Sequence, residues 1–316
     1  MKKYLFKTLI FLLACFAVIT FVLLKYGGYV DYFYVKFTTP KAKSMIIGDS
    51  RSMQGIQPSV VNEALSSKDY SLPVFNYSFT IAQASMGPLY NESILKKLDT
   101  TSSSNGLFII SVTPWMFGSD KNNDNAKGEF REENSPPHNM HYVDVNPNYE
   151  YLLKNLQYFH FRTIFRQSAE MHKDGWLEEK NLPQSEAIFK AWKEGQSKIF
   201  DNMMEEYVVS DIRLESFHKL VIRLQEHGEV ILVRMPIDSD FIEKEHLFYP
   251  SFDSDMERAA QKFNIPYFNF NKQFFATKFK TYDGHHLDKI GGQNFTKTLC
   301  DSIISIKNSI NIPATR

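Results

Sequence analysis

The chain has 316 residues, of which 43% are hydrophobic and 23% are charged, and this is the composition of a globular protein. Lysine plus arginine equals aspartate plus glutamate, 36 against 36, so no overall positive field attracts the chain to nucleic acid, and we predict no nucleic-acid partner. The two cysteines, Cys15 and Cys300, fall in an N-terminal apolar run and in the last expected helix, which excludes a disulfide within the folded domain.

The N-terminus carries an uncharged apolar run, Thr8–Leu24, that follows three lysines. Its 17 residues reach the lower end of the length that spans a bilayer as a helix. A cleaved signal peptide, a lipoprotein signal ending at Cys15 and an uncleaved anchor are the competing interpretations. The run lacks a convincing small-residue cleavage site, and Phe16–Leu24 stays apolar after the cysteine. We therefore predict an uncleaved anchor over residues 1–25.

The orientation of the anchor follows from its position ahead of a large domain. Four lysines come after the run, so the positive-inside count is nearly balanced. A short N-terminal tail then makes an inside N-terminus and an extracytoplasmic domain the default. We predict a single-pass membrane protein in which residues 26–42 form an aromatic stalk and residues 43–312 form the domain.

From residue 43 onward, short apolar segments alternate with amphipathic segments of helical length. The expected strands are Lys43–Ile47, Pro73–Tyr77, Leu107–Val112, Val230–Arg234 and Tyr267–Phe270. The expected helices are Pro58–Leu65, Pro88–Leu98, Leu214–His227, Ser254–Phe263 and Asp288–Lys307. This alternation predicts an α/β fold with a mostly parallel sheet and right-handed crossovers.

One interval, Thr113–Asp211, breaks the alternation after the third strand. It opens with a polar stretch, Gly118–Asn134, and continues through Tyr149–Met171 and Gln184–Tyr207, which both have helical patterns. A connection of this length usually carries structure of its own and often a function. We predict an insertion, residues 113–211, that covers the carboxyl edge of the sheet; a decorative surface subdomain is the alternative.

The first expected strand ends in Gly48-Asp49-Ser50, and α/β folds gather their ligands and catalytic groups at this edge of the sheet. The chain contains one Asp-x-x-His, Asp283-Gly284-His285-His286, just before the last expected helix. Ser50, His286 and Asp283 supply the nucleophile, the base and the orienting acid that acyl transfer through a serine requires. The alternatives are a helix N-cap at Ser50, a turn at Asp283 and a packed histidine.

His285 competes with its neighbour for the role of base. Adjacent side chains of an extended loop point to opposite sides, so only one of the two histidines can face Ser50. The spacing of three residues from Asp283 favours His286.

These two blocks resemble those of the SGNH (GDSL-type) hydrolase superfamily, in which Gly-Asp-Ser follows the first strand and Asp-x-x-His precedes the last helix. The resemblance covers roughly residues 43–307, apart from the long insertion. It implies a flavodoxin-like three-layer α/β/α sandwich and a triad of Ser50, His286 and Asp283. We predict no cofactor and no metal.

The middle blocks depart from the family pattern, which has a glycine after the second strand and Gly-x-Asn-Asp after the third. Here Asn76 ends the second strand, and Ser-x-x-Pro-Trp-x-Phe, which contains Trp115, follows the third. Together with the anchor, these features resemble membrane-anchored members linked to D-alanyl transfer onto teichoic acid and to alginate acetylation. The resemblance implies an acyl group moved to or from an envelope glycopolymer, with that glycopolymer or an acyl-donor protein as partner.

An oxyanion hole is required because negative charge develops on the carbonyl oxygen during acyl transfer. The backbone N–H of Ser50 is the first expected donor, and the side-chain amide of Asn76 is the second, with a turn role as its alternative. Arg51 is expected to pair with an acid or to bind an anionic group. Arg234 and Trp115 lie near the expected site and are candidates for contact with substrate.

Two further features bear on function. His138 and His141 form a His-x-x-His in an expected loop, but no third ligand is evident, so we predict no metal site there. The predicted function is a serine esterase or O-acyltransferase of the cell envelope. The missing glycine and asparagine of the middle blocks motivate an alternative, a non-catalytic scaffold or binding subunit of an envelope polysaccharide complex.

Overall fold

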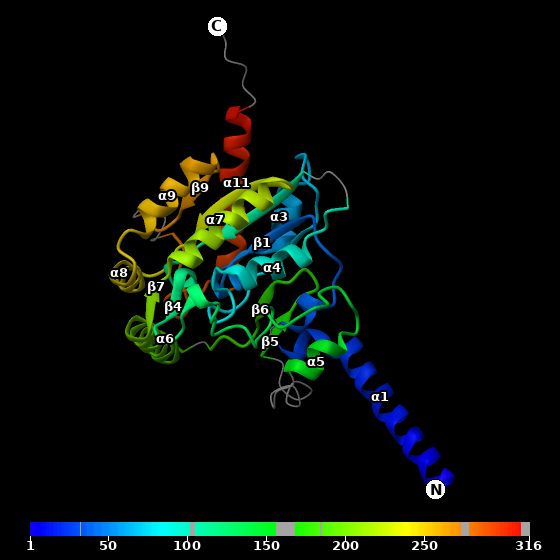
Figure 1. The fold of residues 1–316 in the computed structure, drawn as a ribbon. Helices are drawn as coiled ribbons and strands as arrows, with labels where there is room; N and C mark the ends of the chain where they lie inside the picture. Colours follow the sequence, from blue (N-terminus) through cyan, green and yellow to red (C-terminus); the bar gives the residue numbers. More distant parts are fainter. Residues whose placement is uncertain (32, 102–104, 156–167, 184, 273–277, 311–316) are drawn as a thin grey trace.

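The computed structural model describes residues 1–31, 33–101, 105–155, 168–183, 185–272 and 278–310 (Figure 1). An N-terminal helix, α1 (Lys2–Val30), precedes the domain. The helices that follow are α2 (Ser50–Gly55), α3 (Pro58–Ala64), α4 (Pro88–Lys97), α5 (Tyr149–Asn155), α6 (Glu186–Glu206), α7 (Asp211–Gln225), α8 (Ser239–Phe248), α9 (Phe252–Phe263) and α11 (Lys289–Ile310). Short 3₁₀ helices occur at η1 (Tyr34–Phe37), η2 (Pro114–Phe117) and η3 (Asn125–Lys127).

The main sheet of the described residues has five parallel strands in the order β2-β1-β3-β8-β9. These strands are β1 (Ser44–Ile47), β2 (Val74–Asn76), β3 (Gly106–Ser111), β8 (Gly228–Arg234) and β9 (Tyr267–Asn269). Every residue of β1 and β3 is buried, as expected of parallel strands that are covered on both faces. The predicted α/β class and parallel sheet are confirmed.

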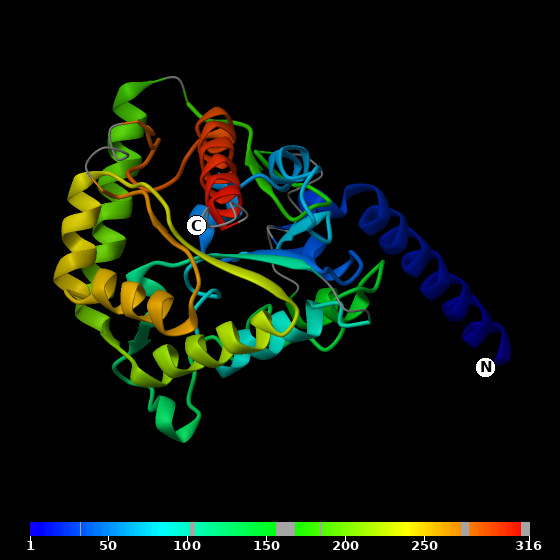
Figure 2. The same ribbon diagram turned by 90° about the horizontal axis from the view of Figure 1, so that it is seen from above.

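Helices lie against both faces of this sheet (Figures 1 and 2). On one face, Ile47 and Phe108 pack with side chains of α4, α7 and α9. On the other face, Ile46 and Ile109 pack with side chains of α3 and α11. The side chains alternate between the two cores because successive residues of a strand point to opposite faces.

The order of the strands reverses at β1, since the chain adds β2 on one side of it and then β3 on the other. The connections that leave the carboxyl ends of β1 and β3 therefore run to opposite sides of the sheet. A crevice forms between such connections, and open α/β sheets bind their ligands there. Ser50 begins α2 directly after β1, so the fold places its hydroxyl at this point.

The N-terminal helix is long and apolar enough to cross a membrane, although length and composition alone fit a signal sequence as well. It continues to Val30, beyond the expected anchor. The predicted stalk at 26–42 differs from the structure, because Tyr34 and Phe37 of η1 belong to the main core. Lys36 is fully buried, and its Nζ donates to the backbone carbonyls of Asn76 and Gly175, each at 2.6 Å.

The long interval after β3 carries structure of its own. Two antiparallel pairs form within its bounds: β4 (Gly118–Asp120) with β7 (Tyr207–Val209), and β5 (Ala169–Met171) with β6 (Leu177–Glu179). The second of its expected helices is present as α6. The first ends at Asn155, residues 156–167 of it lie outside the described residues, and its last three residues form β5 instead.

Candidate active site

Three residues from the two ends of the domain lie together at the carboxyl edge of the sheet. Nε2 of His286 is 2.8 Å from Oγ of Ser50, although 236 positions separate the two residues. Nδ1 of the same ring is 2.7 Å from Oδ2 of Asp283. The other carboxylate oxygen, Oδ1, accepts the backbone N–H groups of His285 at 3.2 Å and His286 at 2.9 Å. The structure thus brings together the nucleophile, base and acid that the sequence pattern predicts.

The helix that carries Ser50 is capped by its neighbour, Asp49. Oδ1 of Asp49 accepts the backbone N–H of Arg51 at 3.0 Å, and Oδ2 accepts the hydroxyl of Thr113 at 2.9 Å. Burial raises the pKa of the Asp49 carboxyl, and nearby Arg51 together with these hydrogen bonds opposes that rise. Since Asp49 is the N-cap of α2, the hydroxyl of Ser50 is left to face the imidazole.

A glycine permits the sharp turn from β1 into α2. Gly48 has φ +157°, and a Cβ there would lie 2.4 Å from Oγ of Ser52 and 2.8 Å from the carbonyl oxygen of Ser111. No side chain fits where β1 approaches β3 so closely. In this turn Gly48 permits the close approach of β1 to β3, Asp49 caps α2, and Ser50 presents its hydroxyl to His286.

The ionisation of Asp283 fixes the tautomer of the His286 ring. Burial acts to raise the pKa of its carboxyl, but the charge of His286 and the hydrogen bonds it receives hold that pKa well below its usual value. An ionised carboxylate only accepts hydrogen bonds, so Nδ1 of His286 must donate to it. Nε2 of His286 is then the acceptor for the hydroxyl proton of Ser50.

The two adjacent histidines lie on the same side of their loop, which differs from the expectation of opposite sides. Their ring centroids are 3.8 Å apart. The reason is Gly284, whose φ of +101° turns the loop out of the extended conformation. Nε2 of His285 is 3.2 Å from Oε1 of Gln196, and its ring packs edge-on against Phe200. Burial and the charge of His286 lower the pKa of His285, so this ring is a neutral support for its neighbour.

Side chains from the interval 113–211 complete the surroundings of the two histidines. Besides Gln196 and Phe200 of α6, Glu179 of β6 lies close enough to His286 to interact with its charge. Burial raises the pKa of the Glu179 carboxyl. Nε1 of Trp176 donates to the backbone carbonyl of Gln54 in α2 at 2.7 Å. No motif marks these residues, and nothing in the sequence pattern could have assigned them to the site.

Asn76 lies beneath α2 and uses its amide to hold that helix. Its Nδ2 donates to the backbone carbonyls of Ser52 at 2.8 Å and Ile56 at 3.1 Å, and its Oδ1 accepts the N–H of Ser78 at 3.1 Å. The residue is 0% exposed. Because an amide has two N–H donors and both are taken, the structure does not bring Asn76 to the site as an oxyanion donor. It fixes α2 to the end of β2 instead.

A buried ionic cluster holds Arg51, the residue that follows Ser50. Oε1 of Glu245 is 2.6 Å from Nη2 of Arg51, and Oε2 is 3.0 Å from Nη2 of Arg234. Arg234 also pairs with Asp253. Arg51 and Arg234 are only 2% and 3% exposed, so both guanidinium groups lie inside the protein. The acid pair expected for Arg51 is present, whereas the substrate contact expected for Arg234 is replaced by ion pairs.

Trp115 also lies inside the protein and does not face the site. It is 2% exposed, and its ring stacks between Phe200 at 5.0 Å and Phe248 at 4.5 Å between centroids. The candidate substrate contact is therefore a packing residue in this structure. Through Phe200 it supports the wall against which His285 rests.

The histidines also raise the question of a metal. Ligand atoms of Asp283, His285 and His286 lie within 4.8 Å of one another, a spacing that a metal ion could use. An ion held by these atoms would displace the hydrogen bonds that His286 makes with Asp283 and Ser50. We therefore assign Asp283 and His286 to the triad and not to a metal site. His138 and His141 have separate partners, a backbone carbonyl for the first and the carboxylate of Glu150 for the second.

A cavity of about 810 Å³ lies beside Tyr282, and its described lining does not include Ser50, Asp283 or His286. Phe189 of α6, Lys280, Tyr282 and the start of α11 line it. The ring of Tyr282 stacks on that of His286 with centroids 5.8 Å apart, and its hydroxyl donates to Oε1 of Gln54 at 2.6 Å. The volume lies within the range of small-molecule sites.

Comparisons with known proteins do not assign the chain to a family. No protein-family model matches the sequence, and no curated protein matches it. The chemical interpretation of the site therefore depends on its own contacts.

Proposed function

We propose that this chain is a serine-dependent acyl ester hydrolase or O-acyltransferase that acts on a cell-envelope glycopolymer. One observation carries the proposal: Oγ of Ser50 lies 2.8 Å from Nε2 of His286, and Asp283 lies 2.7 Å from the other nitrogen of that ring. A serine hydroxyl becomes a useful nucleophile only when a base of this kind can take its proton.

The architecture supports a flavodoxin-like sandwich of the SGNH type. With the strands of the main sheet numbered in chain order, their spatial order is 2-1-3-4-5, the order of flavodoxin-like folds. Helices on both faces of the sheet agree with three layers. Ser50 and the Asp283–His286 loop follow the first strand and precede the last helix, as the resemblance requires.

The proposed reaction proceeds through an acyl-enzyme. Oγ of Ser50 attacks the carbonyl carbon of the acyl donor, and its proton passes to Nε2 of His286. The imidazolium, stabilised by ionised Asp283, returns that proton to the leaving alcohol or thiol as the tetrahedral intermediate collapses. Water or a sugar hydroxyl then gives its proton to His286 and attacks the acyl-enzyme, which releases the acid or the acylated sugar and restores Ser50.

The negative oxygen of the tetrahedral intermediate needs hydrogen-bond donors. Since the amide of Asn76 is occupied, the backbone N–H of Ser50 at the start of α2 is the donor that remains from the sequence prediction. The first N–H groups of a helix have no partner within the helix and lie at its positive end.

The N-terminal helix supports a function at the cell envelope. If α1 spans the membrane, it holds the domain at the bilayer surface, where a membrane-bound acyl donor or a nascent glycopolymer is concentrated. Transfer to a carbohydrate is the form of the proposal that makes most use of such an anchor.

Ester turnover by the full chain in detergent tests the proposal. Wild type should release p-nitrophenol from p-nitrophenyl acetate, and Ser50→Ala should not. Mass spectra of glycopolymer fragments incubated with donor and enzyme should then separate transfer, which adds acyl mass, from hydrolysis, which removes it. Equal ester turnover by wild type and Ser50→Ala would contradict a role for this serine.

A second candidate is a non-catalytic scaffold or glycan-binding subunit. Its support is that two side chains in the regions of the altered middle blocks are used for structure, Asn76 to hold α2 and Thr113 to bind Asp49. A scaffold would bind glycopolymer fragments with the same affinity before and after Ser50→Ala, and neither protein would turn over an ester.

A further inference from the structure

The N-terminal helix is held along its second half by the domain. The ring of Tyr149 in α5 stacks on that of Phe16 with centroids 4.9 Å apart, and its hydroxyl bonds to that of Thr20. Leu23 is 4% exposed and belongs to the main core. Figure 1 shows α5 at the base of the domain, beside the end of α1. The domain therefore contacts the apolar run eight residues before it ends at Leu24.

The length of the apolar run determines how deep in a bilayer the contact between Tyr149 and Phe16 would lie. At 1.5 Å per residue, Thr8–Leu24 is about 25 Å long, slightly less than the roughly 30 Å of a bilayer's hydrocarbon core. The part of α1 that precedes Phe16, Lys2–Cys15, reaches only about 21 Å even with its three lysines included. The helix cannot cross the bilayer without the residues that Tyr149 contacts, so a spanning α1 places α5 at the depth of the lipid.

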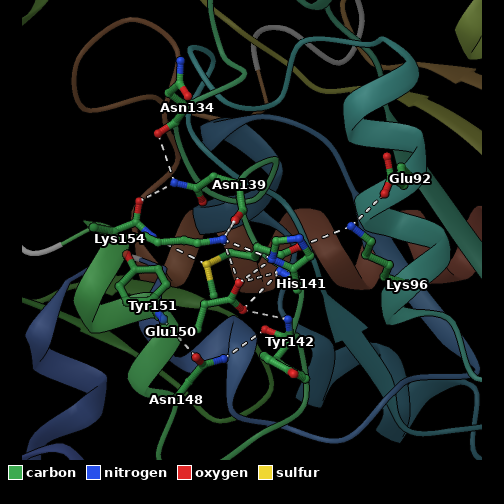
Figure 3. A network of polar contacts seen from close by, with 12 residues as sticks. Glu92, Lys96, Asn134, Asn139, His141, Tyr142, Asn148, Glu150, Tyr151 and Lys154 are labelled. Carbon is green, nitrogen blue, oxygen red and sulfur yellow. Dashed lines mark hydrogen bonds and ion pairs between the residues drawn. The ribbon is translucent and has the colours of Figure 1, made fainter.

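The turn before α5 and α5 itself form one unit that is joined by hydrogen bonds and ion pairs (Figure 3). The carboxylate of Glu150 accepts the backbone N–H groups of His141 and Tyr142, at 3.1 and 2.8 Å, and pairs with Lys154 at 2.8 Å. Burial acts to raise the pKa of Glu150, but Lys154 and these N–H groups lower it to about 2. The carboxylate is therefore ionised and keeps its hydrogen bonds throughout the neutral range.

The same unit is tied to the end of α1. Nδ2 of Asn148 donates to the backbone carbonyls of Phe37 at 3.0 Å and Tyr142 at 2.9 Å. The hydroxyl of Tyr151 bonds to the carboxylate of Asp31, which follows the last turn of the helix. These bonds fix the height of α5 relative to the membrane helix.

Large apolar side chains project from this unit into solvent. Tyr142 is 60% exposed, Val145 is 44% exposed and Leu153 is 84% exposed. Scattered exposed apolar residues are ordinary, but these three lie on the segment whose Tyr149 contacts α1, the one helix among the described residues that is long and apolar enough to span a bilayer. Tyrosine and lysine beside them, as at Tyr149 and Lys154, are typical of the interface between hydrocarbon and headgroups.

We propose that residues 141–155 form a membrane-seating surface: they lie in the interfacial layer of the bilayer, with Leu153 among the acyl chains and Tyr142 at the headgroups. The occupant of this surface is lipid of the leaflet beside the domain. The proposal depends on α1 as a membrane span and is independent of any acyl-transfer activity.

Lipid contact at Leu153 tests the proposal in the full chain. A Cys15→Ala background leaves Cys300, which is buried, as the native thiol. Leu153→Cys and a control, Leu247→Cys, are labelled with a nitrobenzoxadiazole fluorophore and reconstituted in nanodiscs that contain nitroxide-labelled phospholipid. Leu247 is 66% exposed on α8, which Figure 1 shows far from α1. The intact mass of the purified chain establishes that α1 is retained.

We expect the fluorophore at position 153 to be quenched at least about twofold by the lipid nitroxide and shielded from iodide in water, and the one at position 247 to show the reverse. Tyr149→Ala should reduce the quenching at 153, because it removes the contact that sets the depth of α5. Equal behaviour at both positions would overturn the proposal. Shielding from iodide without quenching by lipid would also overturn it, since that result indicates a protein partner on this surface.

Discussion

The two sides of Ser50 are built in different ways. On one side, His286 and Asp283 direct polar atoms toward the hydroxyl and toward each other. On the other side, the amide of Asn76 donates to two backbone carbonyls, and the buried guanidinium of Arg51 forms an ion pair with Glu245. The difference teaches that proximity to a nucleophile in sequence or at a strand end does not make a polar residue available for chemistry. Such a residue is available only if the fold leaves its polar atoms both exposed to the site and unpaired.

The largest expected effect tests the side that carries the base. Ser50→Ala should lower ester turnover at least about 10³-fold, because the proposed acyl-enzyme forms on the Ser50 hydroxyl. Its melting temperature should change little, since the hydroxyl is half-buried and no buried packing is lost. The matched control is Ser52→Ala, two residues on, which removes a buried hydroxyl that bonds to Ser78 and should keep turnover within about tenfold. Similar ester turnover by Ser50→Ala and Ser52→Ala would contradict a specific role for the Ser50 hydroxyl.

Asp283→Asn tests the orientation of the catalytic ring. Asparagine is near in shape but offers an N–H where Nδ1 of His286 also needs to donate, so the ring is driven toward the other tautomer. We expect kcat to fall about 10³ to 10⁴-fold with little change in KM. A variant that retains more than a tenth of wild-type kcat would show that Asp283 does not orient the base.

Glu245→Gln tests the buried ion pairs that Glu245 forms with Arg51 and Arg234. The change leaves the guanidinium groups of Arg51 and Arg234 buried without their shared carboxylate, and we expect a loss of about 3 to 5 kcal/mol of unfolding free energy. Glu243→Gln on the same helix is the control, because Glu243 is exposed and should change stability by less than about 0.5 kcal/mol. Denaturant unfolding of both variants measures the difference; equal midpoints would contradict the assignment of Glu245 to stability.

Asn76→Ala distinguishes a structural amide from an oxyanion donor. Loss of an oxyanion donor lowers kcat about 10² to 10³-fold, whereas loss of a structural amide mainly lowers stability. We expect a decrease of about 1 to 3 kcal/mol in unfolding free energy and less than a tenfold change in kcat below the melting temperature. A stable variant with a hundredfold lower kcat would reverse this assignment and return Asn76 to the oxyanion hole.

The smallest expected effect is a dependence of stability on pH. The pKa of Asp283 is lower in the folded protein than the usual value near 4, so its contribution is fully present above that value. That contribution is lost as the pH falls toward the folded pKa. Between pH 6 and pH 3, wild type should therefore lose more unfolding free energy than Asp283→Asn. Parallel losses in the two proteins would contradict an ionised, hydrogen-bonded carboxylate.

The strands could be predicted because buried parallel strands are continuous apolar segments, and all five strands of the main sheet overlap their expected ranges. Buried charges account for two of the regions that sequence reasoning missed. Helix α8 was not expected, since its inward-facing Glu245 makes the pattern resemble a solvated segment. Lys36 also makes the expected stalk resemble a solvated segment. The carbonyls that accept its hydrogen bonds belong to Asn76 and Gly175, which lie far along the chain.

At the site, a motif could indicate Ser50, Asp283 and His286 because each is defined by its position relative to a strand or a helix. No such rule shows whether a side chain points to the substrate or into the core. Arg234 ends β8 and Trp115 follows β3, yet ion pairs and aromatic stacking hold both inside. Contacts of this kind depend on α6, α8 and α9, whose packing the local sequence does not specify.

The most direct test of the account is the mass of the Ser50 peptide after treatment with a fluorophosphonate. We expect wild type to carry one phosphonate adduct on Ser50 at neutral pH, and His286→Gln to react at least about 10²-fold more slowly, because the base that takes the serine proton is gone. An unmodified Ser50 in folded wild type, or equal rates of labelling in the two proteins, would contradict the claim that His286 activates this serine.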